Sequence, residues 1–425
     1  MMGKDEASDG RQTRSQWKTL EGASRPRRGL GQSTILSVVR QAPVGPFSPL
    51  IALLVVTVLL GVTLYVGWLV RASVRESIRN SLQTVLAANI KALDLWISDQ
   101  RETVKQYAAD EKLRSIAGDL LQRRLPPSES AADTAGNSDN RQRNHEYLNQ
   151  LTLRLQDVGY LGWAIVDPLG AVIRSSDGRF DGGVIPLGKN SFERFTMGEA
   201  TVTRPFEIRS SGGIRSSSGE ESELVDIAVM CAIAPVKRGL AKDELKANGS
   251  IALMIDPARQ FSKILSVAQM GASGETYAFD RQAVMISRSR FEPQLVQAGL
   301  LRDGQSSPLK IHVRDPGVDI RNLAAAPGQL QAWAMTQMAD SATRGGDGYD
   351  VVGYRNYRGV PVVGAWKWVP EFDFGIASEM DVDEAFASLR ILRNSFLALF
   401  GAASVAAAIL LVLAWITRPP VSYTH

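Results

Sequence analysis

The sequence predicts an α+β fold, in which a long stalk helix and two tandem antiparallel-sheet modules lie between two transmembrane helices. Two apolar runs without charge, Leu50 to Val70 and Phe396 to Ile416, predict the transmembrane helices. A helical stripe after the first run predicts the stalk, and short strand patterns that occur twice predict the sheets. The 425 residues are 44% apolar and 22% charged, an ordinary globular composition that excludes no class.

Each apolar run is about 20 residues long, the length that a helix needs to cross a bilayer core of roughly 30 Å. A buried core helix is the alternative, but such helices are usually shorter and have a polar stripe, which neither run shows. A signal peptide is the alternative for the first run, but that run follows a long polar leader and precedes Arg71 and Arg75. We therefore assign transmembrane helices to residues 50–70 and 396–416.

The polar leader, residues 1–49, has more basic than acidic residues, and basic flanks are retained in the cytoplasm. This surplus of basic residues predicts that the leader is cytoplasmic, that the central part is periplasmic or extracellular, and that the tail over residues 417–425 is again cytoplasmic. The polar composition of the leader predicts that it is disordered. The predicted location is the inner membrane, with two passes. The net charge of +4 owes much to the leader and requires no nucleic-acid partner.

Residues 71–122 predict a stalk helix that continues the first transmembrane helix. They contain no proline, and apolar or neutral side chains recur at steps of three and four. A helix of this length packs on the modules, on a second copy of the chain, or on both, so we expect a homodimer through the stalk. The positions of the stripe are Val74, Ile78, Leu82, Val85, Asn89, Leu93 and Trp96.

The first module is predicted over residues 146–270. Residues 123–144 lack periodicity and are rich in turn formers, which predicts a mobile loop before a short helix from Glu146 to Asp157. A further helix is predicted from Pro257 to Met270. The predicted strands are Trp163 to Pro168, Ala171 to Ser175, Phe206 to Ser210, Leu224 to Val236 and Ser250 to Ile255.

The second module is predicted over residues 271–381, followed by a return helix over 382–395. Its aromatic residues Trp366, Trp368, Phe372 and Phe374 are interpreted as core and module interface, with ligand contact as the alternative. The predicted strands are Glu275 to Asp280, Ala283 to Ser287, Tyr349 to Tyr357, Pro361 to Trp368 and Phe374 to Met380.

Catalytic and metal-binding motifs are missing from the sequence. The three histidines, His145, His312 and His425, form no metal-binding pair, and no phosphate loop or Gly-x-Ser-x-Gly elbow occurs. The single cysteine, Cys231, excludes an intrachain disulfide and is interpreted as a small buried apolar residue. The sequence therefore predicts no metal, no cofactor and no enzyme activity.

Three segments carry a resemblance to a known family: WAIVDPLGAVIRSS from Trp163, ETYAFDRQAVMISRSRF from Glu275, and GYRNYRGVPVVGAWKWVPEFDFGIASEMDVDEAF from Gly353. They resemble the double Cache sensor domains of bacterial transmembrane receptors, which have two tandem PAS-like modules. The resemblance covers roughly Arg71 to Arg393. It implies that the membrane-distal module, residues 146–270, binds a small molecule such as an amino acid, an amine or a carboxylate.

Amine-binding members of the family use an ordered set of Tyr, Arg, Trp and Asp residues, which this sequence does not match in order. The guanidinium group of an arginine binds a carboxylate through two parallel hydrogen bonds, so a pair of arginines near one pocket suits an anionic ligand. A surface or salt-bridge role is the alternative for each candidate. By residue type and region, the candidate ligand-binding residues are Trp163, Arg174, Asp177, Arg204 and Asp226.

The resemblance also implies a receptor in which ligand binding moves the second transmembrane helix and changes a cytoplasmic output, such as a kinase, a cyclase or a phosphatase. Only residues 417–425 follow that helix, which predicts a truncated sequence or a separate output partner. The alternative is a membrane-tethered module that binds a partner protein and transmits nothing. An extracytoplasmic hydrolase is disfavoured by the missing motifs.

Overall fold

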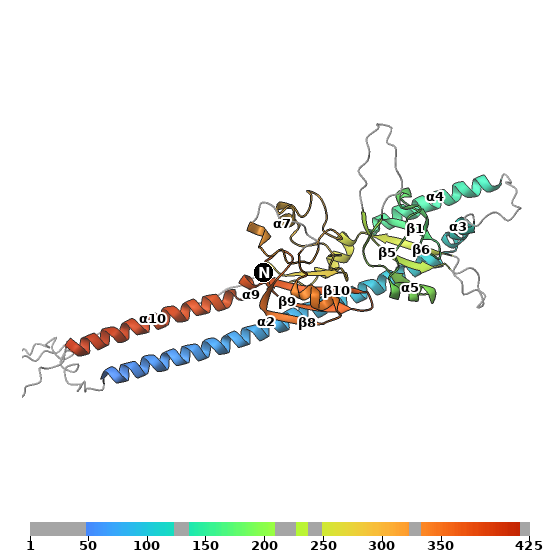
Figure 1. Ribbon diagram of the computed structural model, residues 1–425. Coiled ribbons are helices and arrows are strands. Elements are labelled where there is room, and N and C mark those ends of the chain that lie inside the picture. The colour runs from blue at the N-terminus through green and yellow to red at the C-terminus, as the bar shows by residue number, and fades with distance from the viewer. Residues whose placement is uncertain (1–47, 123–135, 209–226, 237–248, 323–332, 417–425) are drawn as a thin grey trace, which may run out of the picture. The chain divides into compact units, whose positions relative to one another are not determined.

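The computed structural model describes residues 48–122, 136–208, 227–236, 249–322 and 333–416. The chain divides into two compact units: Gly61–Leu399, and a unit made of both chain ends, Met1–Leu60 and Phe400–His425. The larger unit holds both sheets (Figure 1). The predicted leader, the first part of the predicted loop at 123–135, and the predicted tail lie outside the described residues.

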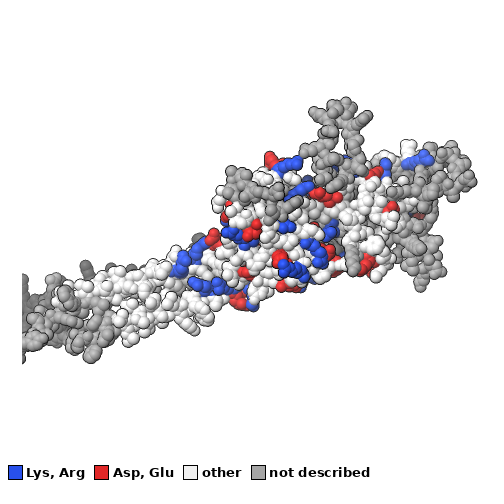
Figure 2. Space-filling model, viewed as in Figure 1, with Lys and Arg blue, Asp and Glu red and all other residues white. Residues whose placement is uncertain are grey.

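Two helices contain the apolar runs: α2 (Ser48–Ala109) begins in the first run, and α10 (Ala387–Ile416) ends in the second. Both are long and apolar enough to cross a membrane. Apolar side chains such as Leu64 and Leu410 are about two-thirds exposed, which suits contact with lipid. In Figure 2, charged side chains of both signs lie over the sheet-bearing part, and the apolar helix ends are white. The orientation of the termini stays a prediction.

The stalk is the part of α2 that follows the apolar run, and one face of it is buried along its length, as the predicted stripe requires. The helix stops at Ala109, and α3 (Glu111–Gln122) begins after Asp110. Asp110 Oδ1 accepts a hydrogen bond from the Leu113 amide at 2.8 Å, which caps the new helix. The prediction of one unbroken helix over 71–122 is therefore wrong at Asp110.

The membrane-distal module has one antiparallel sheet in the order β2-β1-β6-β5-β3, with β4 also paired to β5. Its helices are α4 (Gly136–Asp157), the turn η2 (Gly178–Phe180), α5 (Lys189–Thr196), the π-helical turn η3 (Pro257–Phe261) and α6 (Ser262–Leu265). Its strands are β1 (Gly162–Val166), β2 (Val172–Ser175), β3 (Thr201–Val202), β4 (Phe206–Ile208), β5 (Ile227–Pro235) and β6 (Ser250–Ile255).

The membrane-proximal module has a four-stranded antiparallel sheet in the order β7-β10-β9-β8. Its helices are α7 (Glu292–Gln297), the turn η4 (Ile320–Asn322), α8 (Gln337–Thr343) and α9 (Val382–Ala385), which leads directly into α10. Its strands are β7 (Glu275–Phe279), β8 (Gly348–Arg355), β9 (Pro361–Val369) and β10 (Phe374–Asp381).

The α+β fold with two antiparallel sheets is thus confirmed, and most predicted strands are found within a few residues of their predicted ends. Three predictions are wrong in detail. Helix α4 begins at Gly136, so residues 136–144 are helical and not loop. Residues 283–287 form only isolated bridges, such as Val284 with His312. The helix predicted from Pro257 ends at Leu265.

The aromatic residues of the proximal module lie in its core and at the contact with the distal module, as predicted. Phe374 packs edge-on against Phe261 of η3, with ring centroids 5.8 Å apart. Trp366 is buried, and its Nε1 donates a hydrogen bond to Ser341 at the end of α8. The Phe261–Phe374 contact joins the two modules, whereas Trp366 belongs to the core of the proximal module.

The segment between the modules, residues 266–274, is held by two helices. Asn89 of the stalk is fully buried; its Nδ2 donates to Ala268 O, and its Oδ1 accepts from the Ala268 amide. Glu384 of α9 accepts hydrogen bonds from the amides of Ala272 and Ser273, each at 2.7 Å. Gly271 has a φ of +56°, and a Cβ there would lie 2.2 Å from the Glu384 carboxylate. Glycine is therefore required at this contact.

Candidate ligand-binding site

Trp163 of β1 faces the helices of the distal module. Its side chain is buried, and its Nε1 donates a hydrogen bond of 2.9 Å to Thr152 Oγ1 of α4. It belongs to the apolar core that also contains Leu151 and Leu155 of α4. The indole is therefore fully used by packing and by one hydrogen bond to the protein.

The other described candidates form salt bridges near the surface. Arg174 pairs with Asp181 at 3.6 Å, and Arg204 pairs with Asp373 at 3.8 Å. Asp177 caps η2 through the Arg179 amide and also binds the Arg179 guanidinium, which holds the pKa of Asp177 below its usual value. Asp226 lies outside the described residues. No contact joins Trp163, Arg174, Asp177 and Arg204 to one another among the described residues, and the role of all five candidates in ligand binding stays a prediction.

The sheet face that points away from the stalk is apolar. Cys231 lies in this layer, fully buried, as the sequence predicts. Burial raises the pKa of its thiol far above the ordinary value, so it remains a neutral apolar group. The described residues on this face fill it without a polar lining; they include Val166, Phe180, Ile185, Phe195, Phe206, Ile208, Val229, Ile233 and Met254.

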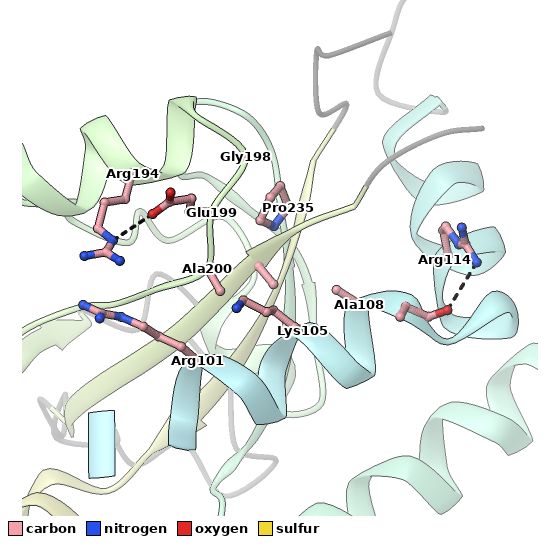
Figure 3. Close-up of a pocket in the computed structure, with 11 residues that line it drawn as sticks. Arg101, Lys105, Ala108, Arg114, Arg194, Gly198, Glu199, Ala200 and Pro235 are labelled. Atoms are coloured by element: carbon pink, nitrogen blue, oxygen red, sulfur yellow. Dashed lines mark hydrogen bonds and ion pairs between the residues drawn. The ribbon is translucent and has the colours of Figure 1, made fainter. Parts of the chain in front are cut away.

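A cationic groove of about 650 Å³ lies on the opposite, stalk-facing side of the distal module. The stalk and α3 form one wall, and the α5–β3 connection and the end of β5 form the other (Figure 3). This volume is in the range of small-molecule sites. The charged side chains that line it are Arg101, Lys105, Arg114, Arg194 and Glu199.

Two arginines of the groove bind the same carboxylate. Arg101 of the stalk donates through Nη1 and Nη2 to Glu371 Oε1, both at 3.2 Å, and Arg194 of α5 donates to the same oxygen at 3.2 Å. Figure 3 shows the two guanidinium groups side by side. The Arg101 side chain is only 14% exposed, and its buried Nε has no hydrogen-bond partner among the described residues. The two arginines thus already bind Glu371, Arg194 also pairs with Glu199 of the groove at 3.2 Å, and the buried Arg101 Nε is left without a partner among the described residues.

Glu371 belongs to the turn between β9 and β10 of the proximal module. The same turn is bound by Asn190 of the distal module, whose Nδ2 donates to Pro370 O at 2.6 Å. Phe372 lies next to Arg101, with the guanidinium carbon 6.0 Å from the ring centroid. Stalk, distal module and proximal module thus meet at a single acidic side chain.

Sequence reasoning did not find this site. Arg101, Arg194 and Glu371 are far apart in the chain, and each alone looks like an ordinary solvated charge. Arg174 and Arg204 stay predicted ligand-binding residues, and Arg101 and Arg194 are a second pair of arginines in the distal part of the chain.

No protein-family model matches the chain, and no curated protein is similar to it. Among solved structures, the chain is similar to the sensor domain of the V. cholerae histidine kinase DctB, with 15% identity and a TM-score of 0.38, over 73% of this chain and 98% of that one. The ligand-binding domain of the Pseudomonas aeruginosa PAO1 amino acid chemoreceptor PctB in complex with L-Gln has 12% identity and a TM-score of 0.37, over 74% and 97%. These neighbours are double Cache sensor domains.

The ligand-binding domain of the Campylobacter jejuni chemoreceptor Tlp3 in complex with 4-methylisoleucine has 12% identity and a TM-score of 0.38, over 74% of this chain and 94% of that one. The solved structures similar to the chain are thus of the kind that the sequence resembles. At these identities and TM-scores the likeness says nothing about the ligand of this chain.

Proposed function

We propose that the chain is a two-pass sensory receptor that binds a small anionic molecule, such as a carboxylate, in the cationic groove. The observation that carries the proposal is the shared hold of Arg101 and Arg194 on Glu371. A carboxylate ligand offers the same chemistry as this side chain, since guanidinium groups bind carboxylates bidentately. The ligand and Glu371 therefore compete for the same donors.

Release of Glu371 would free the turn that joins β9 to β10. β10 runs to Asp381, where α9 begins, and α9 leads into α10, the second candidate transmembrane helix. A ligand that replaces Glu371 thus favours one arrangement of this connection over the other. Such coupling requires a differential affinity, commonly about 1–3 kcal/mol.

The proposal includes termini in the cytoplasm, a central part outside the inner membrane, a homodimer through the stalk, and a cytoplasmic output of the kinase, cyclase or phosphatase kind. In this scheme the chain binds and transmits, and it has no catalytic step. Two uncharged apolar runs, one in α2 and one in α10, on either side of a large solvated part support the two-pass arrangement.

Thermal unfolding of the full chain in lipid nanodiscs, against panels of carboxylates, amino acids, amines and nucleotides, tests the proposal. A ligand at a hundred times its Kd adds about 2.7 kcal/mol to stability, so a bound anion raises Tm measurably. Arg101→Gln and Arg194→Gln each remove a charge-assisted hydrogen bond and should weaken binding at least about tenfold. Glu371→Gln removes the competitor and should tighten binding about fivefold or more.

Arg174→Gln is the matched control, because Arg174 is a surface arginine of the same module that does not line the groove. It should bind as the wild type does. If Arg174→Gln abolishes the shift while Arg101→Gln keeps it, the ligand site is the one predicted from sequence and not the groove. If no anion shifts Tm in any variant, the proposed ligand class is wrong.

A further inference from the structure

Two buried glutamates lie directly opposite each other in the proximal sheet. Glu275 of β7 and Glu379 of β10 are register partners, and they are 5% and 3% exposed. Register partners in an antiparallel sheet have Cβ atoms about 4.5–5.5 Å apart. Two carboxylates cannot both be ionised at this distance without a large energetic cost, unless cations compensate them.

The hydrogen bonds around the pair are unequal. Glu275 is satisfied at both oxygens: Oε2 accepts from the Tyr357 hydroxyl at 2.6 Å, and Oε1 accepts from the Arg290 amide at 2.7 Å. Glu379 Oε1 accepts from the Tyr354 hydroxyl at 2.7 Å. Its Oε2 is buried and makes no hydrogen bond within 3.5 Å among the described residues, although the Tyr277 hydroxyl, which also lacks a partner there, acts on the Glu379 carboxylate. Glu379 is therefore the member that is less well suited to carry a charge.

Among the residues that the structure describes, Arg358 is the only fully buried cation that faces the pair. It lies in the turn between β8 and β9. Its Nη2 donates to Asp381 Oδ1 at 2.7 Å, its Nη1 donates to Gln294 of α7, and its guanidinium stacks on Phe291. The negative charge of Asp381 partly neutralises the Arg358 guanidinium, and the more exposed Arg321 also forms an ion pair with Asp381. Three carboxylates thus share one buried guanidinium.

The groups that face Glu379 come from every element packed around it. β7 contributes Glu275 and Tyr277, β8 contributes Tyr354, and the β8–β9 turn contributes Arg358. The pKa of Glu379 is raised to about 7: burial raises it most and the charge of Glu275 also raises it, whereas hydrogen bonding to Tyr354 and Tyr277 and the charge of Arg358 lower it. Burial also raises the pKa of Glu275, against the hydrogen bond from Tyr357.

We propose that the Glu275–Glu379 pair is a proton-binding site, through which pH acts on the connection from β10 to the second transmembrane helix. The proton resides on Glu379. When it leaves, the new charge attracts Arg358 and competes with Asp381, the last residue of β10 and the residue that precedes α9. This input is separate from the groove and does not require a ligand there.

Gly364 of β9 supports this arrangement. A Cβ at this position would lie 2.3 Å from the Tyr354 hydroxyl and 3.1 Å from Glu379 Cγ. Only glycine leaves room for the tyrosine to reach Glu379 across the sheet. The close contact between Tyr354 and Glu379 is thus built into the backbone of the neighbouring strand.

The first test is the stability of the full chain in nanodiscs between pH 5 and pH 9. The folded protein binds the Glu379 proton more tightly than the unfolded chain does, so stability should fall as pH rises from about 4.5 through about 7. Glu379→Gln should reduce this fall, because the share that Glu379 contributes is lost. Glu102→Gln, an exposed glutamate of the stalk, is the control and should keep the wild-type profile.

The second test reads the proton itself. Infrared spectra of the wild type should contain the carbonyl stretch of a protonated carboxylic acid that half-titrates near pH 7 and is absent from Glu379→Gln. Glu275→Gln removes the neighbouring charge and should move that midpoint to lower pH. Amide hydrogen exchange over residues 380–390, corrected for intrinsic rates, should depend on pH in the wild type only. Identical pH profiles for wild type and Glu379→Gln, or a midpoint unmoved by Glu275→Gln, would overturn the proposal.

Discussion

Arg358→Met is expected to lower the free energy of unfolding by about 3–5 kcal/mol, as removal of one partner of a buried ion pair does. Arg358 is 1% exposed and binds Asp381 and Gln294. Methionine fills similar space against Phe291 but leaves Asp381 and the two glutamates without their buried counter-charge. Urea unfolding of the full chain in nanodiscs, followed by tryptophan fluorescence, measures the change.

A second substitution isolates the charge from the packing. Asp381→Asn in the Arg358→Met background removes the carboxylate that Arg358 binds directly and should recover part of the loss, because Arg321 alone then faces this position. Arg355→Met is the control: Arg355 lies three residues away in the chain and is exposed. Among the described residues it donates to the Gly317 carbonyl and to no other group, so its loss should cost less than about 1 kcal/mol. Equal losses for Arg355→Met and Arg358→Met would contradict the assigned role of Arg358.

The regular elements of this chain could be predicted where local signals and tertiary contacts agree. β6 occupies the predicted residues because an apolar run ends at Asp256, whose side chain caps η3 ahead of Pro257. Helix α4 was missed before residue 146 because Gly136 to Asn144 contains turn formers and no apolar stripe. The break at Asp110 was missed because the helical pattern continues on both sides of it.

The candidate sites were harder to predict, and the reason is physical. In β10, Glu379 and Asp381 alternate with apolar residues, a pattern that also describes a strand with one solvated face. The sequence cannot show that this polar face is covered by α7 and the tyrosines of β7 and β8. The groove could not be predicted from the sequence for the same reason. Arg101 and Arg194 can be recognised as a pair only when the fold places both beside the Glu371 carboxylate.

Asn89→Leu is expected to destabilise the larger unit by about 3 kcal/mol, because it leaves several buried polar groups without partners. Asn89 is fully buried in the stalk and binds both the amide and the carbonyl of Ala268; its Nδ2 also donates to Thr276 Oγ1 of β7 at 3.0 Å. Leucine has similar volume, so cavity formation contributes little and the loss reports the hydrogen bonds. Urea unfolding measures the stability.

The same substitution should loosen the segment between the modules. Amide hydrogen exchange over residues 266–274 should speed up in Asn89→Leu more than the loss of global stability explains, because the stalk no longer holds Ala268. Asn80→Leu, on the exposed face of the same helix, is the matched control and should leave both readouts unchanged. Glu384→Gln should accelerate exchange at Ala272 and Ser273 with little effect near Ala268. Uniform acceleration along 266–274 in both variants would mean that the two helices do not hold the segment at separate points.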